Sequence, residues 1–313
     1  MAGSPKLPWS RLPTRVRDAV QTHLGSPVVT AVAQDGGFSA GLAARVRCAD
    51  GTRAFVKAVG LSVNDHTPAM HRREALIAAA LPDDVPTPRL RFGYDDGDWV
   101  ALVFDESSGR TPVSPWDVDD AVRVAGAVLA LTATLTPCPL PAVVDAVVLL
   151  ADDLISWSRL AAVPPPDLDP WELRHLDRLA ALGEAAADPA GPMAGDTLLH
   201  LDLRSDNVLL EPGGPVVFVD WPWAARGAAW LDPVTFALDP MTHGGHDPEQ
   251  VLERAGWTDP DPDGVTALLL ALAGMWAESS RQPAPAGMPT VRRHQRRFHD
   301  TALAWGRRRC GWA

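Results

Sequence analysis

The sequence has few cysteines and no long uninterrupted hydrophobic run. Cys48, Cys138 and Cys310 are the only cysteines in 313 residues, and they form no CxxC pair. A disulfide framework or a cysteine-bound zinc site is therefore not expected, and a reducing cytoplasm fits best. No stretch reaches the roughly 18 consecutive apolar residues of a membrane span. The first residues, MAGSPKLPWSRLPTR, lack the apolar core of a signal peptide. We expect a cytoplasmic protein with no membrane association.

Positive charge is also scarce. Lysine and arginine number 28 against 39 aspartates and glutamates, which gives a net charge of −11. Such a surface disfavours nucleic acid as a partner. The charge is uneven, because residues 232–263 are rich in acids whereas residues 291–309 carry seven arginines. We expect both stretches to be solvated helix faces, and the basic one lacks the aromatic residues typical of nucleic-acid binding.

The remaining composition, 46% hydrophobic and 21% charged, is that of an ordinary globular protein. The first 105 residues read as β-rich. VVTAVAQ is a strand-like run, and alternation around the turn signal ADG predicts a hairpin with Lys57 on its second strand. A single helix is expected over residues 67–81, followed by a second hairpin around DDGD at residues 89–104.

From residue 106 to residue 313 the pattern becomes mainly helical, with proline-rich breaks and no internal repeat. One further short strand is expected in PVVFVDW, and the segment VTALLLALAGMWA reads as a buried helix. We predict two lobes, residues 1–105 and residues 106–313, and ligands favour the cleft between such lobes. The predicted helices cover residues 117–135, 142–160, 169–187, 232–240, 248–255, 262–280 and 289–309.

A polar cluster lies between two apolar runs in LLHLDLRSDNVLL, residues 198–210. The residues after it alternate as two short strands joined by EPGG. Because a short hairpin brings its outer ends together, Asp202, Asn207 and Asp220 should converge. Two carboxylates and one amide oxygen suit Mg²⁺, which keeps several waters and takes few protein ligands. Such a site implies bound phosphate, although Asp202 and Asn207 read alone are equally typical of a turn.

The N-terminal lobe contributes matching features. The loop DGGFSAG contains three glycines, which let backbone N–H groups approach phosphates closely. Lys57 on the next strand supplies a positive charge, and Glu74 on the following helix is placed to hold it. Loop, lysine, glutamate, acidic loop and strand-end aspartate follow the order that a kinase fold needs.

On these motifs the sequence resembles the aminoglycoside phosphotransferase and choline-kinase family, distant relatives of protein kinases, over residues 28–280. HLDLRSDN matches the family's His-x-Asp-x-x-x-x-Asn, and VVFVDW matches its strand-borne aspartate. The resemblance implies an α+β, bilobal protein-kinase-like fold. It also implies a phosphotransferase that uses ATP or GTP with Mg²⁺ to phosphorylate a hydroxyl of a small molecule.

The resemblance assigns roles to individual residues. Asp202 would receive the hydroxyl proton, Arg204 would stabilise the transferring phosphoryl group, and Asn207 with Asp220 would hold Mg²⁺. His200 and Asp232 are expected to be structural, with Asp232 bracing the catalytic loop. The nucleotide would be bound by the glycine-rich loop, by the lysine with its helix glutamate, and by a hinge in ALVFDES. These residues are Gly36, Gly37, Ser39, Lys57, Glu74, Phe104, Asp105 and Glu106.

The substrate is the open question. The acidic stretch 232–263 falls where this family recognises substrates, which favours a cationic acceptor such as an aminoglycoside or amino sugar. No APE-like element follows Asp220 and the helical insert before Asp202 is long, so a protein substrate is disfavoured. Antibiotic-resistance, biosynthetic and salvage roles stay open, as does the oligomeric state. The alternatives are a catalytically silent kinase-fold binding protein, a protein kinase, and a metal-dependent hydrolase using His200.

Overall fold

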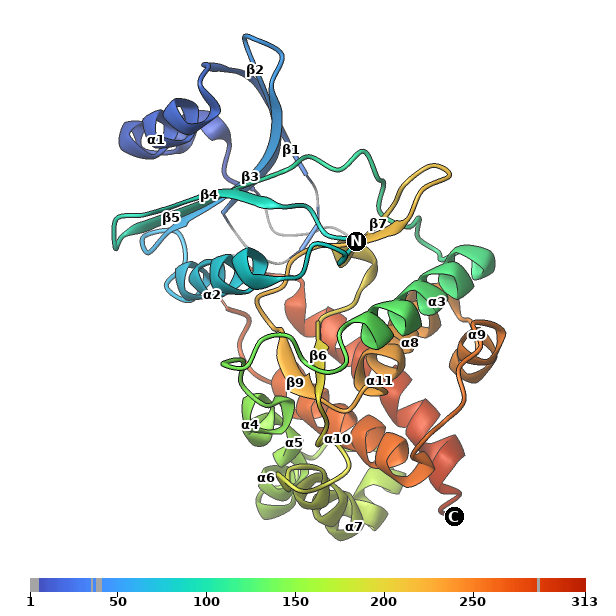
Figure 1. The fold of residues 1–313 in the computed structure, drawn as a ribbon. Helices are drawn as coiled ribbons and strands as arrows, with labels where there is room; N and C mark the ends of the chain where they lie inside the picture. Colours follow the sequence, from blue (N-terminus) through green and yellow to red (C-terminus); the bar gives the residue numbers. More distant parts are fainter. Residues whose placement is uncertain (1–5, 35, 38–40, 286–287) are drawn as a thin grey trace. The chain divides into compact units, whose positions relative to one another are not determined.

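The computed structural model of the protein describes residues 6–34, 36–37, 41–285 and 288–313. The chain forms two compact units that each combine segments distant in sequence (Figure 1). The lobe boundary after residue 105 stays a prediction, because the compact units are not continuous stretches of chain. The first unit comprises the described residues up to 112, with 205–223 and 284–290, and the second comprises 113–204, 224–283 and 291–313.

A five-stranded antiparallel sheet forms the centre of the first unit, with the strand order β1-β2-β3-β5-β4. Both predicted hairpins are confirmed: β2 pairs with β3 around the ADG turn, and β4 pairs with β5 around DDGD. The strands are β1 (Val28–Ala33), β2 (Leu42–Cys48), β3 (Arg53–Gly60), β4 (Leu90–Asp95) and β5 (Trp99–Phe104).

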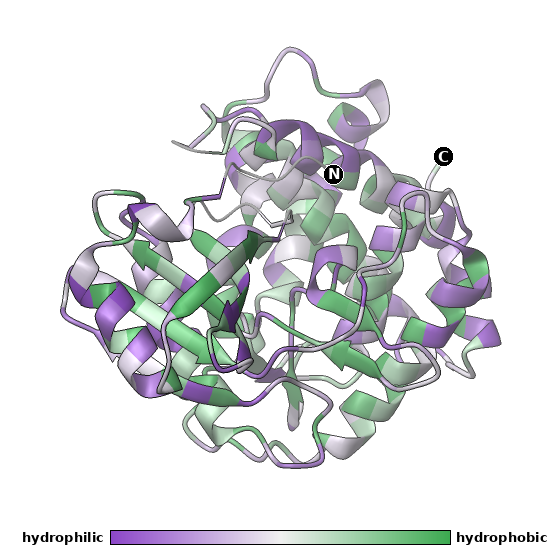
Figure 2. Ribbon diagram, turned by 90° about the horizontal axis from the view of Figure 1, so that it is seen from above, coloured by the Kyte–Doolittle hydropathy of each residue, from purple (hydrophilic) through white to green (hydrophobic). Residues whose placement is uncertain are grey.

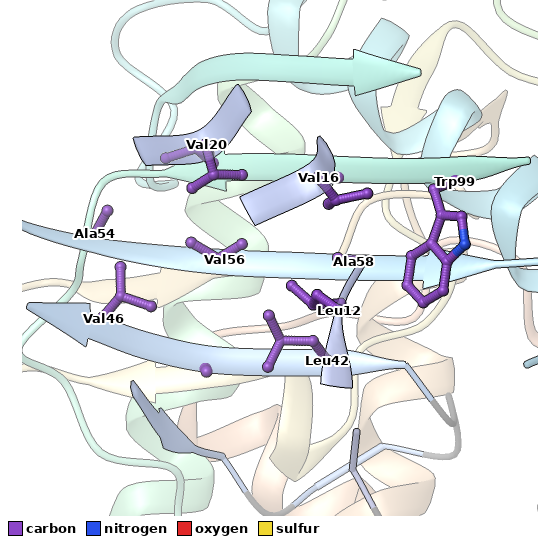
Figure 3. Close-up of a cluster of buried hydrophobic side chains, with 12 residues drawn as sticks. Leu12, Val16, Val20, Leu42, Val46, Ala54, Val56, Ala58 and Trp99 are labelled. Atoms are coloured by element: carbon purple, nitrogen blue, oxygen red, sulfur yellow. The ribbon is translucent and has the colours of Figure 1, made fainter. Parts of the chain in front are cut away.

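Two helices cover the two faces of this sheet, α1 (Thr14–Leu24) and α2 (Thr67–Ala80). All six residues of β5 are buried because successive side chains point to opposite faces and both faces are covered. On the α2 side, Ala78 packs with alternate residues of β5. On the other side, residues before and within α1 pack on the sheet (Figure 3); they are Leu12, Val16 and Val20 against Leu42, Val46, Ala54, Val56, Ala58 and Trp99.

The expectation of a single helix in this region was wrong, because α1 precedes the sheet. Only Val16 and Val20 of its eleven residues are buried. Two apolar residues one turn apart, surrounded by polar ones, make a weak helical pattern in a sequence. The helix is stabilised by the sheet face beneath it, which the local sequence does not reveal.

The second unit is mainly helical, as predicted, and its predicted helices are confirmed apart from the segment 142–160. That segment forms three short helices, interrupted at Leu150 and Ile155. The backbone packs closely on α7 (Pro170–Ala186) here, since a Cβ added to Gly183 would clash with the backbone oxygen of Leu154. The helices are α3 (Val118–Thr134), α4 (Ala146–Leu149), α5 (Ala151–Leu154), α6 (Ser156–Ala162), α7 (Pro170–Ala186), α8 (Leu231–Gly244), α9 (Pro248–Arg254), α10 (Pro262–Ser280) and α11 (Val291–Cys310).

The helix α10 lies at the centre of this unit and packs along α11, α7 and α6. Its apolar run is buried, as expected from the sequence. Coloured by hydropathy, most helices show hydrophilic and hydrophobic segments in alternation, as helices with one buried face do (Figure 2). Within the described part of the chain, no helix is both long enough and apolar enough to cross a membrane.

The acidic stretch 232–263 and the arginine-rich helix α11 bind each other, so they are not simply solvated faces. Arg309 forms ion pairs with Glu249 and Asp259, and Arg308 lies 3.0 Å from Asp247. Asp247 also caps α9 by accepting two backbone N–H groups. Part of the charge of the two unusual runs is therefore paired within one unit.

Candidate active site

Three side chains of the first unit meet in a partly buried ion cluster: Lys57 on β3, Glu74 on α2, and Asp220, which follows β8 (Val216–Phe218). Lys57 Nζ lies 2.7 and 2.9 Å from the two carboxylate oxygens of Glu74 and 2.8 Å from Asp220 Oδ1. The Lys57 side chain is 12% exposed and that of Glu74 is 3% exposed. The predicted pairing of the strand lysine with the helix glutamate is thus confirmed as a contact.

Burial and charge act against each other in this cluster. Burial lowers the pKa of Lys57, but the carboxylates of Asp220 and Glu74 outweigh it, so the pKa lies above its usual value. Burial raises the pKa of Glu74, and the charge of Asp220 adds to this effect. The ammonium of Lys57 and a hydrogen bond from the Trp221 backbone N–H oppose it. Lys57 consequently remains a full positive charge at neutral pH, held between two carboxylates.

A short hairpin places Asn207 and Asp220 at its outer ends, as the sequence predicted. Its strands are β7 (Val208–Leu210) and β8 (Val216–Phe218), and the Val219 N–H donates to the Asn207 carbonyl at 3.0 Å. Asp220 has a φ of 69°, a left-handed conformation that a non-glycine residue rarely adopts. Asp220 thus combines a strained backbone conformation with a carboxylate that contacts Lys57.

The donor atoms at this hairpin fit Mg²⁺. The described residues contain no group of three or more His, Cys, Asp or Glu side chains able to hold a metal ion. The described residues therefore include no site at which protein side chains alone surround a metal ion. Mg²⁺ needs only one or two carboxylates, because water and phosphate complete its ligands. Asp220 supplies a carboxylate that is 39% exposed, and Asn207, which has a side-chain amide, lies at the adjacent end of the hairpin.

The glycine-rich loop is bound to the acidic cluster through Asp206, for which the sequence indicated no role. The Gly37 backbone N–H donates to Asp206 Oδ2 at 3.0 Å. Gly36 and Gly37 both have positive φ angles, 152° and 63°, which explains the glycines there. Ser39, predicted in the same loop, lies outside the described residues. No local pattern predicts the Asp206 contact, because 169 positions separate its two residues.

The predicted hinge residues follow directly from β5. Phe104 is buried, and its ring centroid lies 5.9 Å from Lys57 Nζ. The side chains of Asp105 and Glu106 form ion pairs with Arg91 and Arg53, respectively. These acids therefore connect the segment after β5 to its two neighbouring strands, β4 and β3, and any contact of theirs with a base would come from the backbone.

Asp202 and Arg204 belong to the second unit, so the expected convergence of Asp202 with Asn207 and Asp220 stays a prediction. Arg204 donates to Asp202 Oδ1 at 2.8 Å, and the two side chains are 19% and 23% exposed, respectively. The Asp202 backbone N–H donates to His200 Nδ1 at 3.3 Å. His200 thus holds the backbone of Asp202, and Arg204 holds its side chain.

As expected, Asp232 braces the loop that contains Asp202. Its two carboxylate oxygens accept the N–H groups of His200 at 2.7 Å and Leu201 at 2.9 Å. Burial raises the pKa of Asp232 to about 6, and the two N–H donors oppose that rise. Leu201 has a φ of 60°, so the brace holds a second left-handed residue directly before Asp202. His200 is fully buried, in agreement with a structural role.

These features match a known family. A model described as the phosphotransferase enzyme family matches residues 37–268, most of the chain. The chain belongs to this family. The predicted resemblance and the predicted enzyme class, a phosphotransferase, are thereby confirmed.

Solved structures agree with the kinase-like α+β fold predicted from the sequence. Choline kinase LicA from Streptococcus pneumoniae has a TM-score of 0.62 at 13% identity, over 93% of this chain and 98% of that chain. Spectinomycin phosphotransferase APH(9)-Ia, in complex with ADP and spectinomycin, has a TM-score of 0.59 at 10% identity, over 94% and 98%. Aminoglycoside phosphotransferase APH(4)-Ia, in complex with ADP and hygromycin B, has a TM-score of 0.58 at 14% identity, over 94% and 98%. A search of curated proteins finds no match. At these identities the likeness establishes the fold.

Proposed function

We propose that this phosphotransferase transfers the γ-phosphoryl group of ATP or GTP to a hydroxyl of a small molecule, with Mg²⁺ as the metal. The ion cluster of Lys57, Glu74 and Asp220 is the observation that carries the proposal. A lysine held by a helix glutamate and placed beside a strand-end aspartate is the arrangement with which kinase folds bind nucleotide phosphates. Structural neighbours crystallised with ADP add support.

In this proposal the first unit binds the nucleotide. Lys57 contacts the phosphates, Gly36 and Gly37 present backbone N–H groups to them, and Phe104 lies at the base-binding hinge. Asn207 and Asp220 hold Mg²⁺, which when bound supplies positive charge to the phosphates during transfer. Lys57 is already fixed and charged, so little reorganisation is needed when phosphate arrives.

The second unit supplies the residues that act on the hydroxyl of the acceptor. Asp202 accepts the proton of the acceptor hydroxyl as its oxygen bonds to phosphorus and the bond to the ADP leaving oxygen breaks. Arg204 fixes the Asp202 carboxylate through their 2.8 Å hydrogen bond and offers further N–H groups to the transferring phosphoryl. Positioning and charge neutralisation account for most of the rate in such reactions.

The acceptor is proposed to be a hydroxylated small molecule. The acidic stretch 232–263 no longer argues for a cationic one, since several of its carboxylates bind arginines of α11 or cap helices. The hypothesis of a cationic acceptor now depends on the neighbours, which include a choline kinase and a spectinomycin phosphotransferase. An antibiotic-resistance role would require that an antibiotic be the acceptor.

The test is ADP or GDP formation in the presence of a panel of hydroxylated compounds, with choline, aminoglycosides, macrolides and neutral sugars as separate arms. We expect one arm to stimulate nucleotide cleavage and to yield a phosphomonoester visible by mass spectrometry. Asp202→Ala should lose this activity while still binding nucleotide. Asp152→Ala, a change at an exposed aspartate of the same unit, is the matched control and should retain it. Undiminished transfer by Asp202→Ala, or no nucleotide binding by the wild type, would overturn the proposal.

A further inference from the structure

Lysine is almost absent from this protein, and both of its lysines lie in the first unit, near the residues proposed to bind the nucleotide. Of 28 lysines and arginines, only Lys6 and Lys57 are lysines. Lys57 belongs to the ion cluster with Glu74 and Asp220, and Lys6 lies beside Gly37 of the glycine-rich loop. A Cβ atom added to Gly37 would lie 3.9 Å from Lys6 Nζ and 3.8 Å from Asp206 Oδ2. The ammonium of Lys6 and the carboxylate of Asp206 therefore lie on the same side of this loop residue.

Lys6 is held at this position by the residues that follow it. The Leu7 backbone N–H donates to the Gly41 carbonyl at 3.2 Å. Leu7 and Trp9 pack against the hydrophobic cluster on the α1 face of the sheet, and Leu12 is buried within it. The chain is thus anchored one residue after Lys6, which keeps the Lys6 backbone beside the loop.

A buried histidine lies one turn before Glu74 on α2. His71 lies three residues before Glu74, on the same side of the helix. It is 6% exposed, and its Nε2 has no hydrogen-bond partner among the residues that the structure describes. Burial and, to a smaller extent, the charges of Lys57 and Lys6 lower the pKa of His71 to about 3, and the charge of Asp220 opposes them. The imidazole is therefore neutral at physiological pH, and both lysines are close enough to act on it.

These groups suit a polyphosphate. A lysine ammonium is a compact charge that binds phosphate oxygens, and a neutral imidazole N–H donates one hydrogen bond without adding charge. The Gly37 N–H already donates to a carboxylate, which shows that the loop presents a donor suited to an anion. We propose that Lys6 and His71 bind the phosphate chain of the nucleotide together with Lys57, Lys6 through an ion pair and His71 through Nε2. This inference rests on the nucleotide-dependent function proposed above.

The scarcity of lysine permits a direct test on the unmodified protein. Reductive methylation with formaldehyde and borane labels lysines and the amino terminus, so peptide mass spectrometry can follow Lys6 individually. Mg–ATP should slow the labelling of Lys6, whereas adenosine, which lacks phosphates, should not. Equal labelling of Lys6 with Mg–ATP and with adenosine would overturn its assignment. A wild type that shows no heat of ATP binding by calorimetry would instead contradict the proposed function itself.

Matched variants test the two side chains by calorimetric affinities for ATP and adenosine. Lys6→Met should weaken ATP binding roughly tenfold, and Lys6→Arg should restore part of it. His71→Gln places an amide nitrogen near the position of Nε2, whereas His71→Asn places it near Nδ1. We therefore expect His71→Asn to weaken ATP binding roughly three- to tenfold and His71→Gln to bind nearly as well as the wild type. Adenosine affinity should be unchanged in all four, which also verifies folding. ATP affinities that are equal in Lys6→Met, His71→Asn and the wild type would refute the inference.

Discussion

The variant Asp232→Asn should distinguish two contributions of Asp232 to the free energy of unfolding. One is the cost of burying its carboxylate beneath the catalytic loop, and the other is the hydrogen bonds that this carboxylate accepts. Burial raises the pKa of Asp232 from 3.8 to about 6 in the folded protein. A raised folded-state pKa means that the folded protein binds the proton more tightly than the unfolded chain. Stability attributable to this residue therefore rises as the pH falls through about 6, and the gain is complete below the unfolded value.

The magnitude follows from the two pKa values. Between about pH 7.5 and about pH 4.5, the wild type should gain about 2 kcal/mol of unfolding free energy relative to Asp232→Asn. Other carboxylates act in the opposite direction; for example, ion pairing with Arg72 lowers the pKa of Asp95 to about 2. Such effects are common to both proteins and cancel in the difference. The asparagine also loses one of the two acceptors for the His200 and Leu201 N–H groups, which shifts its stability at every pH.

The measurement is urea unfolding of both proteins at the two pH values, followed by tryptophan fluorescence. The difference between wild type and variant should change with pH, and turnover of the variant should fall because the loop before Asp202 loses part of its support. If the two proteins lose or gain stability in parallel over this range, Asp232 does not titrate as a buried carboxyl, and the reasoning fails.

Three further changes test other parts of the structure. Lys57→Met leaves two carboxylates facing each other without a cation, so kcat/KM should fall by about 100-fold or more in an ADP-release assay, and near-normal turnover would contradict its role. Gly274→Ala places a Cβ 2.6 Å from the Trp157 ring and should destabilise the protein by roughly 1–3 kcal/mol in denaturant unfolding. Gly126→Ala, where an added Cβ meets nothing within 4 Å, is its control and should be neutral or stabilising by up to about 1 kcal/mol; equal effects at the two glycines would refute the packing argument. Arg309→Gln should lower the unfolding free energy by about 1 kcal/mol at low ionic strength and by less at high salt, and a salt-independent loss would exclude ion pairing as the cause.

Local patterns in the sequence determined much of the fold. Period-2 alternation with a turn signal identified both hairpins of the first unit, and helical periodicity located most helices of the second. The hairpin argument also placed Asn207 and Asp220 at adjacent ends of β7 and β8, because a two-stranded turn has little conformational choice. These features depend on residues within about one or two turns of each other, so a single sequence contains the necessary information.

The tertiary structure alone decided the contacts between distant segments. The sheet stabilises α1, whose own pattern is weak, and three carboxylates of the acidic stretch pair with arginines of α11. Asp206 reaches the Gly37 backbone, and Lys6 is brought to the same loop. Such contacts depend on how apolar faces pack and which buried polar groups then need partners, and neither is encoded in a short window of sequence. The motif residues of this phosphotransferase are thus readable from the chain, whereas the groups that surround them became visible only in the folded protein.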